Sequence, residues 1–219
     1  MSYAGTMKTS ARDEFEAWAG TYDRSLLNRF MFQPSYRMFL EELYAWRKDI
    51  DEPFDLLDIG CGTGTFDAML TASPLKANVV ALDYAPAMCK VGAEKALHAG
   101  IADRLRFTAA DSEHLPLADG SFDAVTCSNS FHHYPHQQNV VHEMRRVLRP
   151  GGRLMLIDGF RDNVIGWVVF DVIIAAVEKH VFHAPWSTIH QYFEAAGFRE
   201  IRRRKFNLWF PLLLTVGTA

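Results

Sequence analysis

The sequence predicts an α/β protein with a doubly wound, mostly parallel sheet, and three features of the chain lead to this prediction. A short buried strand at residues 56–59 runs into three alternating glycines, and a helical pattern follows them. Further apolar strands alternate with helical segments along the chain. Two of these strands lead to acids, Asp83 and Asp111, at the end of the sheet where such folds bind ligands.

Composition favours one compact unit and excludes several classes of partner. The 219 residues are 49% hydrophobic, which is enough to bury the core of a single α/β domain. A net charge of -3 provides no general attraction for nucleic acid or for an anionic membrane. The three cysteines are widely separated, which predicts neither disulfides nor a zinc site and indicates a reducing, cytoplasmic location. The first residues lack the apolar region of a signal peptide.

The stretch LLDIGCGTG has the composition of a cofactor loop. Glycine allows the backbone to turn sharply and to approach a ligand where a Cβ atom would collide. Thr63 and Thr65 are available as caps of the following helix, whose first N–H groups would face a polar ligand. The third glycine comes one residue earlier than in the G-x-G-x-x-G fingerprint of dinucleotide-binding folds. A glycine-rich turn without a ligand is the alternative interpretation.

The G-x-G-x-G spacing resembles motif I of the class I S-adenosylmethionine-dependent methyltransferases. In that family the loop wraps the methionine end of the cofactor, and an acid at this position of the strand helps to hold the amino group. The resemblance therefore implies S-adenosylmethionine as the cofactor and S-adenosylhomocysteine as its product. It assigns five residues of the strand and loop to the cofactor site: Asp58, Gly60, Cys61, Gly62 and Gly64.

Acids at the ends of the next two strands extend the resemblance. Asp83 stands where a carboxylate can accept hydrogen bonds from both ribose hydroxyls, and capping of the following helix is its alternative role. Asp111, with Ser112, matches the acid that family members place beside the adenine amine, and a turn cap is the alternative. Two further residues either line the adenine, as in similar proteins, or pack in the core: Tyr84 and Met88.

An aromatic-rich helical pattern precedes the loop. It runs from Asp13 to about Trp46, and Pro34 is expected to divide it into two helices. Its large apolar residues at helical spacing indicate packing on the sheet. The stretch FEAWAGTYD nevertheless resembles the helical lid that precedes motif I in many small-molecule methyltransferases. This resemblance implies that Tyr22 covers the cofactor.

The loop FHHYPH follows the fourth strand and carries the candidate catalytic residues. Histidine titrates near neutrality and can deprotonate an acceptor, which makes His132, His133 and Tyr134 the candidates. Asp158, after the fifth strand, is a lesser candidate, and Asn129 is assigned to the cofactor site. In an extended segment only one histidine is expected to face the cofactor. Packing beneath the lid is the alternative role, and a metal site is not expected because the zinc-helix spacing is missing.

The string EMRRVLRPGGRLML closely matches the ubiquinone/menaquinone methyltransferase-like superfamily, and the whole resemblance covers residues 56–158. It implies a seven-stranded, mostly parallel sheet with helices on both faces and a terminal antiparallel hairpin. It also implies a single domain with a tail and helical lid at residues 1–50 and a core at residues 51–219. A helical cap is expected as an insertion at about residues 160–186.

The cap region contains an apolar stretch at residues 163–177, and the terminal hairpin contains a basic run at residues 202–205. The apolar stretch is shorter than the roughly 20 residues of a transmembrane helix. It is expected to form a wall for a hydrophobic acceptor, and a buried helix, a homodimer interface or peripheral membrane contact are the alternatives. The basic run is expected to be a solvated edge strand rather than an RNA contact.

The expected function is S-adenosylmethionine-dependent methyl transfer to a small, hydrophobic acceptor through an oxygen, nitrogen or carbon atom. The alternative is a catalytically silent methyltransferase-fold protein that acts through a partner, although the cofactor motifs are intact. The glycine spacing disfavours a nicotinamide-dependent oxidoreductase. RNA methylation would require a basic face that the composition does not supply.

Overall fold

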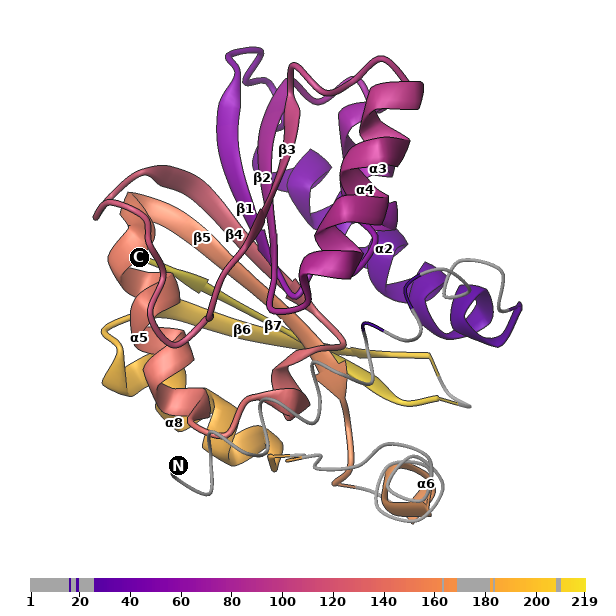
Figure 1. Cartoon of the computed structure of the whole chain (residues 1–219). Helices are drawn as coiled ribbons and strands as arrows, with labels where there is room; N and C mark the ends of the chain where they lie inside the picture. The colour runs from indigo at the N-terminus through magenta and orange to yellow at the C-terminus, as the bar shows by residue number, and fades with distance from the viewer. Residues whose placement is uncertain are drawn as a thin grey trace.

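A computed structural model of the chain describes Glu16, Ala19, Phe182 and residues 26–162, 164–168, 184–207 and 210–219. Within these residues, seven strands form one sheet in the order β3-β2-β1-β4-β5-β7-β6 (Figure 1). Strands β1 to β5 are mutually parallel, and β7 is antiparallel to both of its neighbours. The strands are β1 (Phe54–Ile59), β2 (Ala77–Asp83), β3 (Leu105–Ala109), β4 (Phe122–Ser128), β5 (Leu148–Gly159), β6 (Arg199–Phe206) and β7 (Leu212–Thr218). The predicted fold class and terminal hairpin are confirmed.

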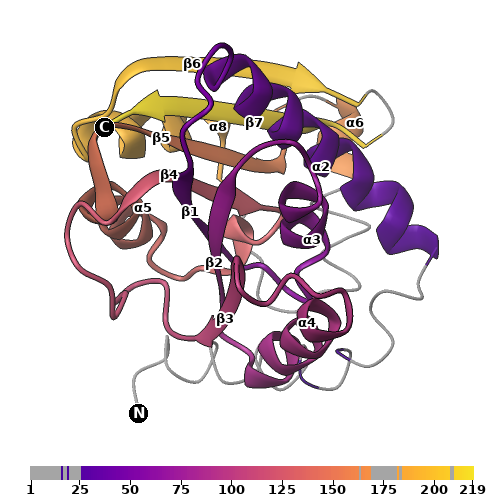
Figure 2. The ribbon, with the colours of Figure 1, turned by 90° about the horizontal axis from the view of Figure 1, so that it is seen from above.

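Helices cover both faces of the sheet (Figure 2). On one face lie α2 (Leu26–Trp46), α3 (Thr65–Thr71) and α4 (Pro86–His98). On the other face lie α5 (Gln137–Val147) and α8 (Trp186–Ala195). Two short helices complete the described elements, the 3-10 helix η2 (Phe131–His133) and α6 (Val164–Gly166).

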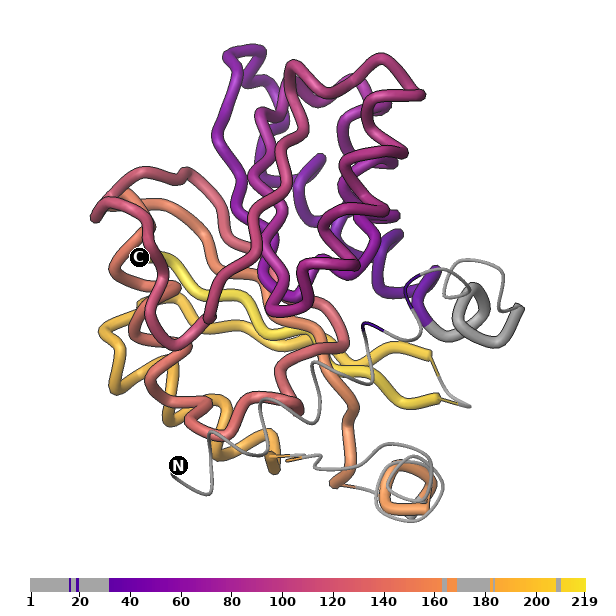
Figure 3. The backbone as a smooth tube through the Cα atoms, viewed as in Figure 1, coloured from indigo at the N-terminus to yellow at the C-terminus, as the bar shows by residue number. Residues whose placement is uncertain are grey.

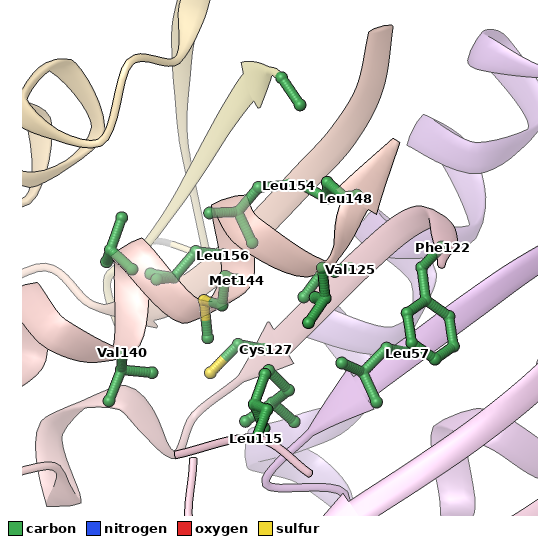
Figure 4. Close-up of a cluster of buried hydrophobic side chains, with 14 of the residues drawn as sticks. Leu57, Leu115, Phe122, Val125, Cys127, Val140, Met144, Leu148, Leu154 and Leu156 are labelled. Carbon is green, nitrogen blue, oxygen red and sulfur yellow. The ribbon is translucent and has the colours of Figure 1, made fainter. Parts of the chain in front are cut away.

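Alternation along the strands divides the core into two layers. Leu56 packs on the side of α2 and α3, whereas Leu57 packs on the side of α5 and α8. Successive side chains of a strand point to opposite faces, so a strand buried on both faces is apolar throughout. In the second layer, Val140 and Met144 of α5 lie over the strand residues Val125 and Cys127 (Figure 4).

Strands β1 and β4 are neighbours in the sheet although β2 and β3 lie between them in the chain (Figure 3). The chain therefore leaves the carboxyl end of β1 toward one side of the sheet and that of β4 toward the other. In open α/β sheets the divergence of two such connections creates the crevice in which ligands bind. The glycine loop follows β1 and the histidine loop follows β4, so both predicted functional loops meet at this crevice.

Pro34 does not divide the N-terminal helical pattern, because α2 runs through it without interruption. A proline inside a helix removes one backbone hydrogen bond and costs about 3 kcal/mol. The turns after Pro34 bury Met38, Phe39 and Leu43 against the sheet. Burial of each such side chain contributes about 1.5 to 3 kcal/mol, which is enough to offset the cost of the proline.

The basic run of β6 lies at an edge of the sheet, as predicted, and two of its arginines pair with acids of α2. Arg202 binds Glu42 through both guanidinium nitrogens, and the Glu42 side chain is only 8% exposed. Arg204 approaches Glu41 at 3.3 Å, but both side chains are more than half exposed. The pair of Arg202 with Glu42 therefore joins the N-terminal helix to the edge of the sheet, whereas the other pair is a solvated contact.

In the portion of the chain that the structure describes, no helix combines the length and the apolar character that crossing a membrane requires.

The two pairs between β6 and α2 allow a matched test of stability. Arg202→Ala leaves the buried Glu42 carboxylate without its partner, and we expect the free energy of unfolding to fall by about 2 kcal/mol. Arg204→Ala removes an exposed pair and is expected to cost less than about 0.5 kcal/mol. Urea denaturation measures both values. Adding Glu42→Gln to Arg202→Ala should recover much of the loss, and equal losses for the two single variants would contradict this account.

Candidate active site

The glycine loop is held against the end of β2 by its own backbone. The amides of Gly60 and Cys61 donate to the Leu82 carbonyl at 2.8 and 3.1 Å, and the Gly62 amide donates to Asp83 Oδ2 at 2.9 Å. All three glycines adopt the left-handed conformation, with φ between 55° and 75°. Glycine reaches this region without the steric cost that other residues carry, so the loop conformation depends on the G-x-G-x-G spacing.

Two of the glycines make room for neighbouring side chains of the protein. A Cβ atom on Gly60 would lie 2.2 Å from Ser130 Oγ, and one on Gly64 would lie 2.3 Å from Phe107 Cζ. The glycine spacing predicted that the backbone here can be approached closely by a ligand. At Gly60 and Gly64 the glycines have a further reason, because side chains of the loop after β4 and of β3 fill the space beside the backbone.

The expected threonine caps of α3 are also corrected. Gly64 is the N-cap residue, and in the described structure no side chain caps this helix. Lys95 of α4 instead donates to the Thr63 carbonyl at 3.0 Å, to Thr63 Oγ1 at 3.3 Å and to Thr65 Oγ1 at 3.4 Å. The two hydroxyls are turned toward the ammonium group rather than toward the first N–H groups of α3. Lys95 thus links α4 to the glycine loop through these hydrogen bonds.

Asp58 lies in β1 directly opposite Thr126 of β4, whose hydroxyl donates to Asp58 Oδ1 at 2.6 Å. Burial raises the pKa of Asp58 to about 7, the hydrogen bond from Thr126 opposes the rise, and the charge of Asp83 adds to it. A carboxylate with this pKa is costly to ionise in the absence of a cation. Asp58 is therefore suited to a positively charged partner such as an amino group.

Asp83 occupies the end of β2 and organises the loops on both sides of it. Its Oδ2 accepts from the Gly62 amide at 2.9 Å, and its Oδ1 accepts from the Ala85 amide at 2.8 Å. Burial raises the pKa of Asp83, and the same two amides oppose the rise. The residue is partly exposed, and each carboxylate oxygen can accept more than one hydrogen bond. Asp83 thus fits the ribose role while also bracing the start of α4.

A third acid, Asp67, lies beneath the same loop and was not anticipated. It is fully buried in α3, and neither carboxylate oxygen has a hydrogen-bond partner among the described residues. Burial raises its pKa well above the usual range, and Asp58 adds to the rise. Three carboxyl groups therefore gather around the glycine loop. A ligand carrying ammonium and sulfonium groups would favour the ionised form of these carboxyl groups, so the residues present fit S-adenosylmethionine.

The other predicted cofactor residues lie around the same end of the sheet. Tyr84 is 38% exposed, whereas Met88 is 1% exposed and packs with Ala19 and Ala85. Asp111 Oδ1 accepts from the Glu113 amide at 3.0 Å, so its turn-capping role is present, and the adjacent Ser112 is buried. Tyr22 lies outside the described residues, as does most of the predicted cap at residues 160–186.

Asn129 directly follows β4 and adopts the left-handed conformation, with a φ of 52°. Its side-chain amide donates to Ser35 of α2 at 3.0 Å and to Ser128 at 2.8 Å. Ser35 is fully buried, so this contact ties the N-terminal helix to the end of β4. The predicted role of Asn129 in the cofactor site remains a prediction, and what the geometry displays is a residue that turns the chain into the histidine loop.

The histidine loop is not extended, which corrects the expectation that its two histidines point apart. Phe131–His133 form the 3-10 helix η2, and the rings of His132 and His133 lie side by side with centroids 4.2 Å apart. In such a helix adjacent residues do not alternate between two faces as they do in a strand. The two rings therefore occupy the same region of the crevice.

His132 is held firmly by Asp158 at the end of β5. Its Nδ1 lies 2.7 Å from Asp158 Oδ1, and its backbone amide donates to Asp158 Oδ2 at 2.8 Å. The Gly159 amide also donates to Asp158 Oδ1 at 2.7 Å. Because an ionised carboxylate accepts, we assign the donating proton of the neutral imidazole to Nδ1. That assignment leaves Nε2 as the basic nitrogen of His132.

Tyr134 turns its hydroxyl away from the histidine pair and into a buried cluster. The hydroxyl lies 3.1 Å from Ser130 Oγ and 4.0 Å from Cys127 Sγ. Burial raises the pKa of Tyr134 well above its ordinary value, and the pKa of Cys127 is raised for the same reason. Both groups are therefore protonated at neutral pH, which makes Tyr134 a poor general base.

Several residues of the site carried no signal in the sequence. Thr126 faces Asp58 through strand register, and Gln137 links two backbone segments by donating to the carbonyls of Phe131 at 3.1 Å and Phe182 at 2.7 Å. The Phe182 amide in turn donates to the His132 carbonyl at 2.6 Å. Phe182, in the predicted cap, is thus bound to the loop that carries His132. In the sequence, these residues stand out only as polar residues in a buried strand and at the N-terminus of a helix, which does not predict their partners.

Comparison with known proteins shows which family this chain resembles. The profile of a family described as a methyltransferase domain matches residues 57–156. The ubiquinone/menaquinone biosynthesis C-methyltransferase UbiE of Brucella anthropi is 36% identical over 148 residues, which cover 67% of this chain and 56% of UbiE. Methyltransferase GfsG of Streptomyces halstedii is 38% identical over 138 residues, which cover 63% of this chain and 48% of GfsG. The chain thus spans about half the length of these curated relatives.

Solved structures resemble the fold over almost its whole length. The magnesium protoporphyrin IX methyltransferase ChlM from Synechocystis PCC 6803, with bound SAH, gives a TM-score of 0.76 at 16% identity and covers 96% of this chain and 99% of that one. A chain from the complex of the Haloferax volcanii Trm112 methyltransferase activator with a putative methyltransferase gives 0.74 at 19% identity, covering 94% and 97%. The fold is that of the class I methyltransferases. The match over residues 57–156 and the sequence relatives show that the chain belongs to the class I S-adenosylmethionine-dependent methyltransferase family.

The packing at Gly60 makes a sharp prediction for its replacement. Gly60→Ala combines a left-handed φ of 75° with a Cβ atom 2.2 Å from Ser130 Oγ. We expect a loss of more than about 2 kcal/mol of unfolding free energy and at least about tenfold weaker binding of S-adenosylhomocysteine. The control is Gly100→Ala, with a φ of 68° and open space beside it, which should cost about 1 kcal/mol and leave binding unchanged. Thermal denaturation and calorimetric titration supply both readouts.

The raised pKa of Asp58 predicts how stability depends on pH in the cofactor-free protein. Folding raises this pKa from 3.8 to about 7, so the folded state binds the proton more tightly than the unfolded state. The contribution to stability is therefore fully present below the unfolded pKa and is lost as pH rises toward 7. Asp58→Asn removes the ionisation while retaining an acceptor for Thr126. Its stability relative to wild type should grow by on the order of 2 kcal/mol between about pH 5 and about pH 8.

Denaturation at several pH values measures this difference. A gap between the Asp58→Asn variant and wild type that does not change with pH would show that Asp58 keeps an ordinary pKa in the folded protein. Calorimetric titration of the same variant with S-adenosylmethionine should show greatly weakened binding, because the carboxylate that is expected to hold the amino group of the cofactor is gone.

Proposed function

We propose that this protein transfers a methyl group from S-adenosylmethionine to a hydroxyl oxygen of a small, hydrophobic acceptor. The observation that carries the proposal is the pair of His132 and Asp158, joined at 2.7 Å beside the glycine loop. A histidine whose Nδ1 is bound by a carboxylate presents Nε2 as a base, and a hydroxyl acceptor needs a base more than a neutral amine does.

The cofactor supplies a methyl group on a positively charged sulfonium that a nucleophile can attack in line. The chain contributes the surroundings for this reaction. Asp58 and Asp83 hold the amino and ribose ends of the cofactor, and the loop Gly60–Gly64 follows β1 into the crevice. Placing the two reactants in contact and excluding water are the main requirements for such a transfer.

His132 accepts the proton of the acceptor hydroxyl at Nε2 as the oxygen becomes nucleophilic. This creates a positive charge on the imidazole, which Asp158 stabilises. The Asp158 carboxylate also accepts hydrogen bonds from the backbone amides of His132 and Gly159. The three hydrogen bonds fix the orientation of both groups before the acceptor arrives. His133 lies beside His132 and is a further surface for the acceptor.

A second candidate is methylation of a ring carbon in a hydroxylated aromatic acceptor. The similarity to the C-methyltransferase UbiE favours it, and the same base would deprotonate the ring hydroxyl to raise electron density on the carbon. Product structure separates the two candidates, because an ether and a ring methyl group give different methyl resonances in NMR. The free thiols of Cys61, Cys89 and Cys127 support a reducing, cytoplasmic setting for either reaction.

The test uses methyl-labelled S-adenosylmethionine with a panel of phenols, hydroxylated quinone precursors and aliphatic alcohols. His132→Gln should lower kcat by about 10²-fold to 10⁴-fold, and Asp158→Asn should lower it by a similar factor because the tautomer is no longer enforced. Binding of S-adenosylhomocysteine should change less than about threefold in both variants, since neither residue is assigned to the cofactor.

The matched control is His142→Gln. His142 is an exposed histidine of α5 whose Nδ1 contacts its own helix at the Gln138 carbonyl, and its loss should leave turnover unchanged. Wild-type turnover in His132→Gln would disprove the proposed base. Tight binding of S-adenosylhomocysteine without turnover of any acceptor would favour the alternative of a catalytically silent member that acts through a partner.

A further inference from the structure

A buried hydrogen-bonded cluster connects the glycine loop to the helix that carries His132. Ser130 Oγ donates to the Ile59 carbonyl at 3.3 Å and lies 3.1 Å from the Tyr134 hydroxyl. Cys127 Sγ lies 3.2 Å from Ser130 Oγ and 4.0 Å from the Tyr134 hydroxyl. With Ser130 donating to Ile59, its oxygen can accept the proton of Tyr134, so the cluster runs from Tyr134 through Ser130 to the last residue of β1.

The cluster includes the residues at both ends of the helix η2. Ser130 is the N-cap residue of this helix, and Tyr134 is its C-cap residue. The His133 amide donates to the Ser130 carbonyl at 3.0 Å, and the Tyr134 amide donates to the Phe131 carbonyl at 3.2 Å. The Tyr134 ring also packs edge-on against Phe131, with centroids 5.9 Å apart. The helix that presents His132 is therefore fastened at both ends by groups that meet at β1.

The contact with Gly60 is too close to permit independent movement of the two loops. A Cβ atom at Gly60 would lie 2.2 Å from Ser130 Oγ, 2.5 Å from Ser130 Cβ and 2.8 Å from the Tyr134 hydroxyl. Interiors packed this closely transmit displacements rather than absorb them. A shift of the Gly60 backbone on filling of the cofactor site would be passed to Ser130 and from there to η2.

We propose that Tyr134 is a positioning residue which, through Ser130, couples the occupancy of the cofactor loop to the placement of His132. This inference rests on the proposed function, because it takes the glycine loop as the cofactor site and His132 as the base. It assigns Tyr134 a role that involves no proton transfer to substrate. Tyr134 acts through its hydroxyl and its fit against Gly60, and His132 remains the residue that contacts the acceptor.

The test measures cofactor binding and the environment of His132 without any acceptor. Calorimetry gives the Kd for S-adenosylhomocysteine, and proton–carbon NMR follows the Cε1–H signal of His132, assigned by its absence in His132→Gln. In wild type, saturation with S-adenosylhomocysteine should shift that signal. Tyr134→Phe should bind S-adenosylhomocysteine about threefold to tenfold more weakly, as expected for loss of one buried hydrogen bond, and should show a much smaller shift at saturation.

Two further variants keep the test decisive. Ser130→Ala removes the middle of the connection and should reproduce the effect of Tyr134→Phe, while the double variant should be little worse than either single one because the residues act in series. Tyr44→Phe, at a tyrosine that is 43% exposed, is the matched control and should behave as wild type.

Wild-type affinity together with a wild-type shift of the His132 signal in both Tyr134→Phe and Ser130→Ala would overturn the proposal. A wild-type protein whose His132 signal does not respond to saturating S-adenosylhomocysteine would overturn it equally. Failure of wild type to bind S-adenosylhomocysteine at all would instead refute the proposed cofactor, and with it the coupling. Loss of turnover in His132→Gln tests the base separately, so the two failures are distinguishable.

Discussion

The parallel pairing of β1 with β4 is the constraint on which the site depends. It sets Asp58 opposite Thr126 and brings two loops that are distant in the chain to one end of the sheet. The glycine loop and the histidine helix then meet at Gly60, where Ser130 occupies the space that a side chain on residue 60 would need. Neither loop has a regular structure long enough to define its own shape. Their geometry follows from the strands that end beneath them.

The acids at this end of the sheet differ in their hydrogen-bonded surroundings. Around the glycine loop, burial raises the pKa of Asp58, Asp67 and Asp83, so ionising them in the cofactor-free protein opposes folding. The Asp158 carboxylate, by contrast, accepts hydrogen bonds from two backbone amides and from a histidine ring. The first group is prepared for a cation that comes from outside, whereas the second is already satisfied by the chain. Under the proposed function, this difference in surroundings would give acids of the same chemistry the separate roles of binding a charge and orienting a base.

The agreement between sequence and structure was closest where one local rule applied. The apolar strands followed from hydrophobic periodicity, and the terminal hairpin followed from the family resemblance. Errors arose where packing between distant segments decided the outcome. Pro34 lies within a continuous helix because burial of Phe39 and its neighbours offsets the missing hydrogen bond, and Thr65 turns its hydroxyl toward Lys95 instead of capping its helix. The sheet that buries Phe39 and the lysine that binds Thr65 are both distant from these residues in the chain.

The sequence alone determined that this protein has a doubly wound sheet, which strand ends carry its polar residues, and that its loop resembles motif I of the class I methyltransferases. These features are encoded locally, in periodicity and in the spacing of glycines. Only the tertiary structure decided that Asp158 binds His132, that Thr126 binds Asp58 and that the Tyr134 hydroxyl meets Ser130. Strand order and register establish these contacts, and both depend on the packing of the whole sheet.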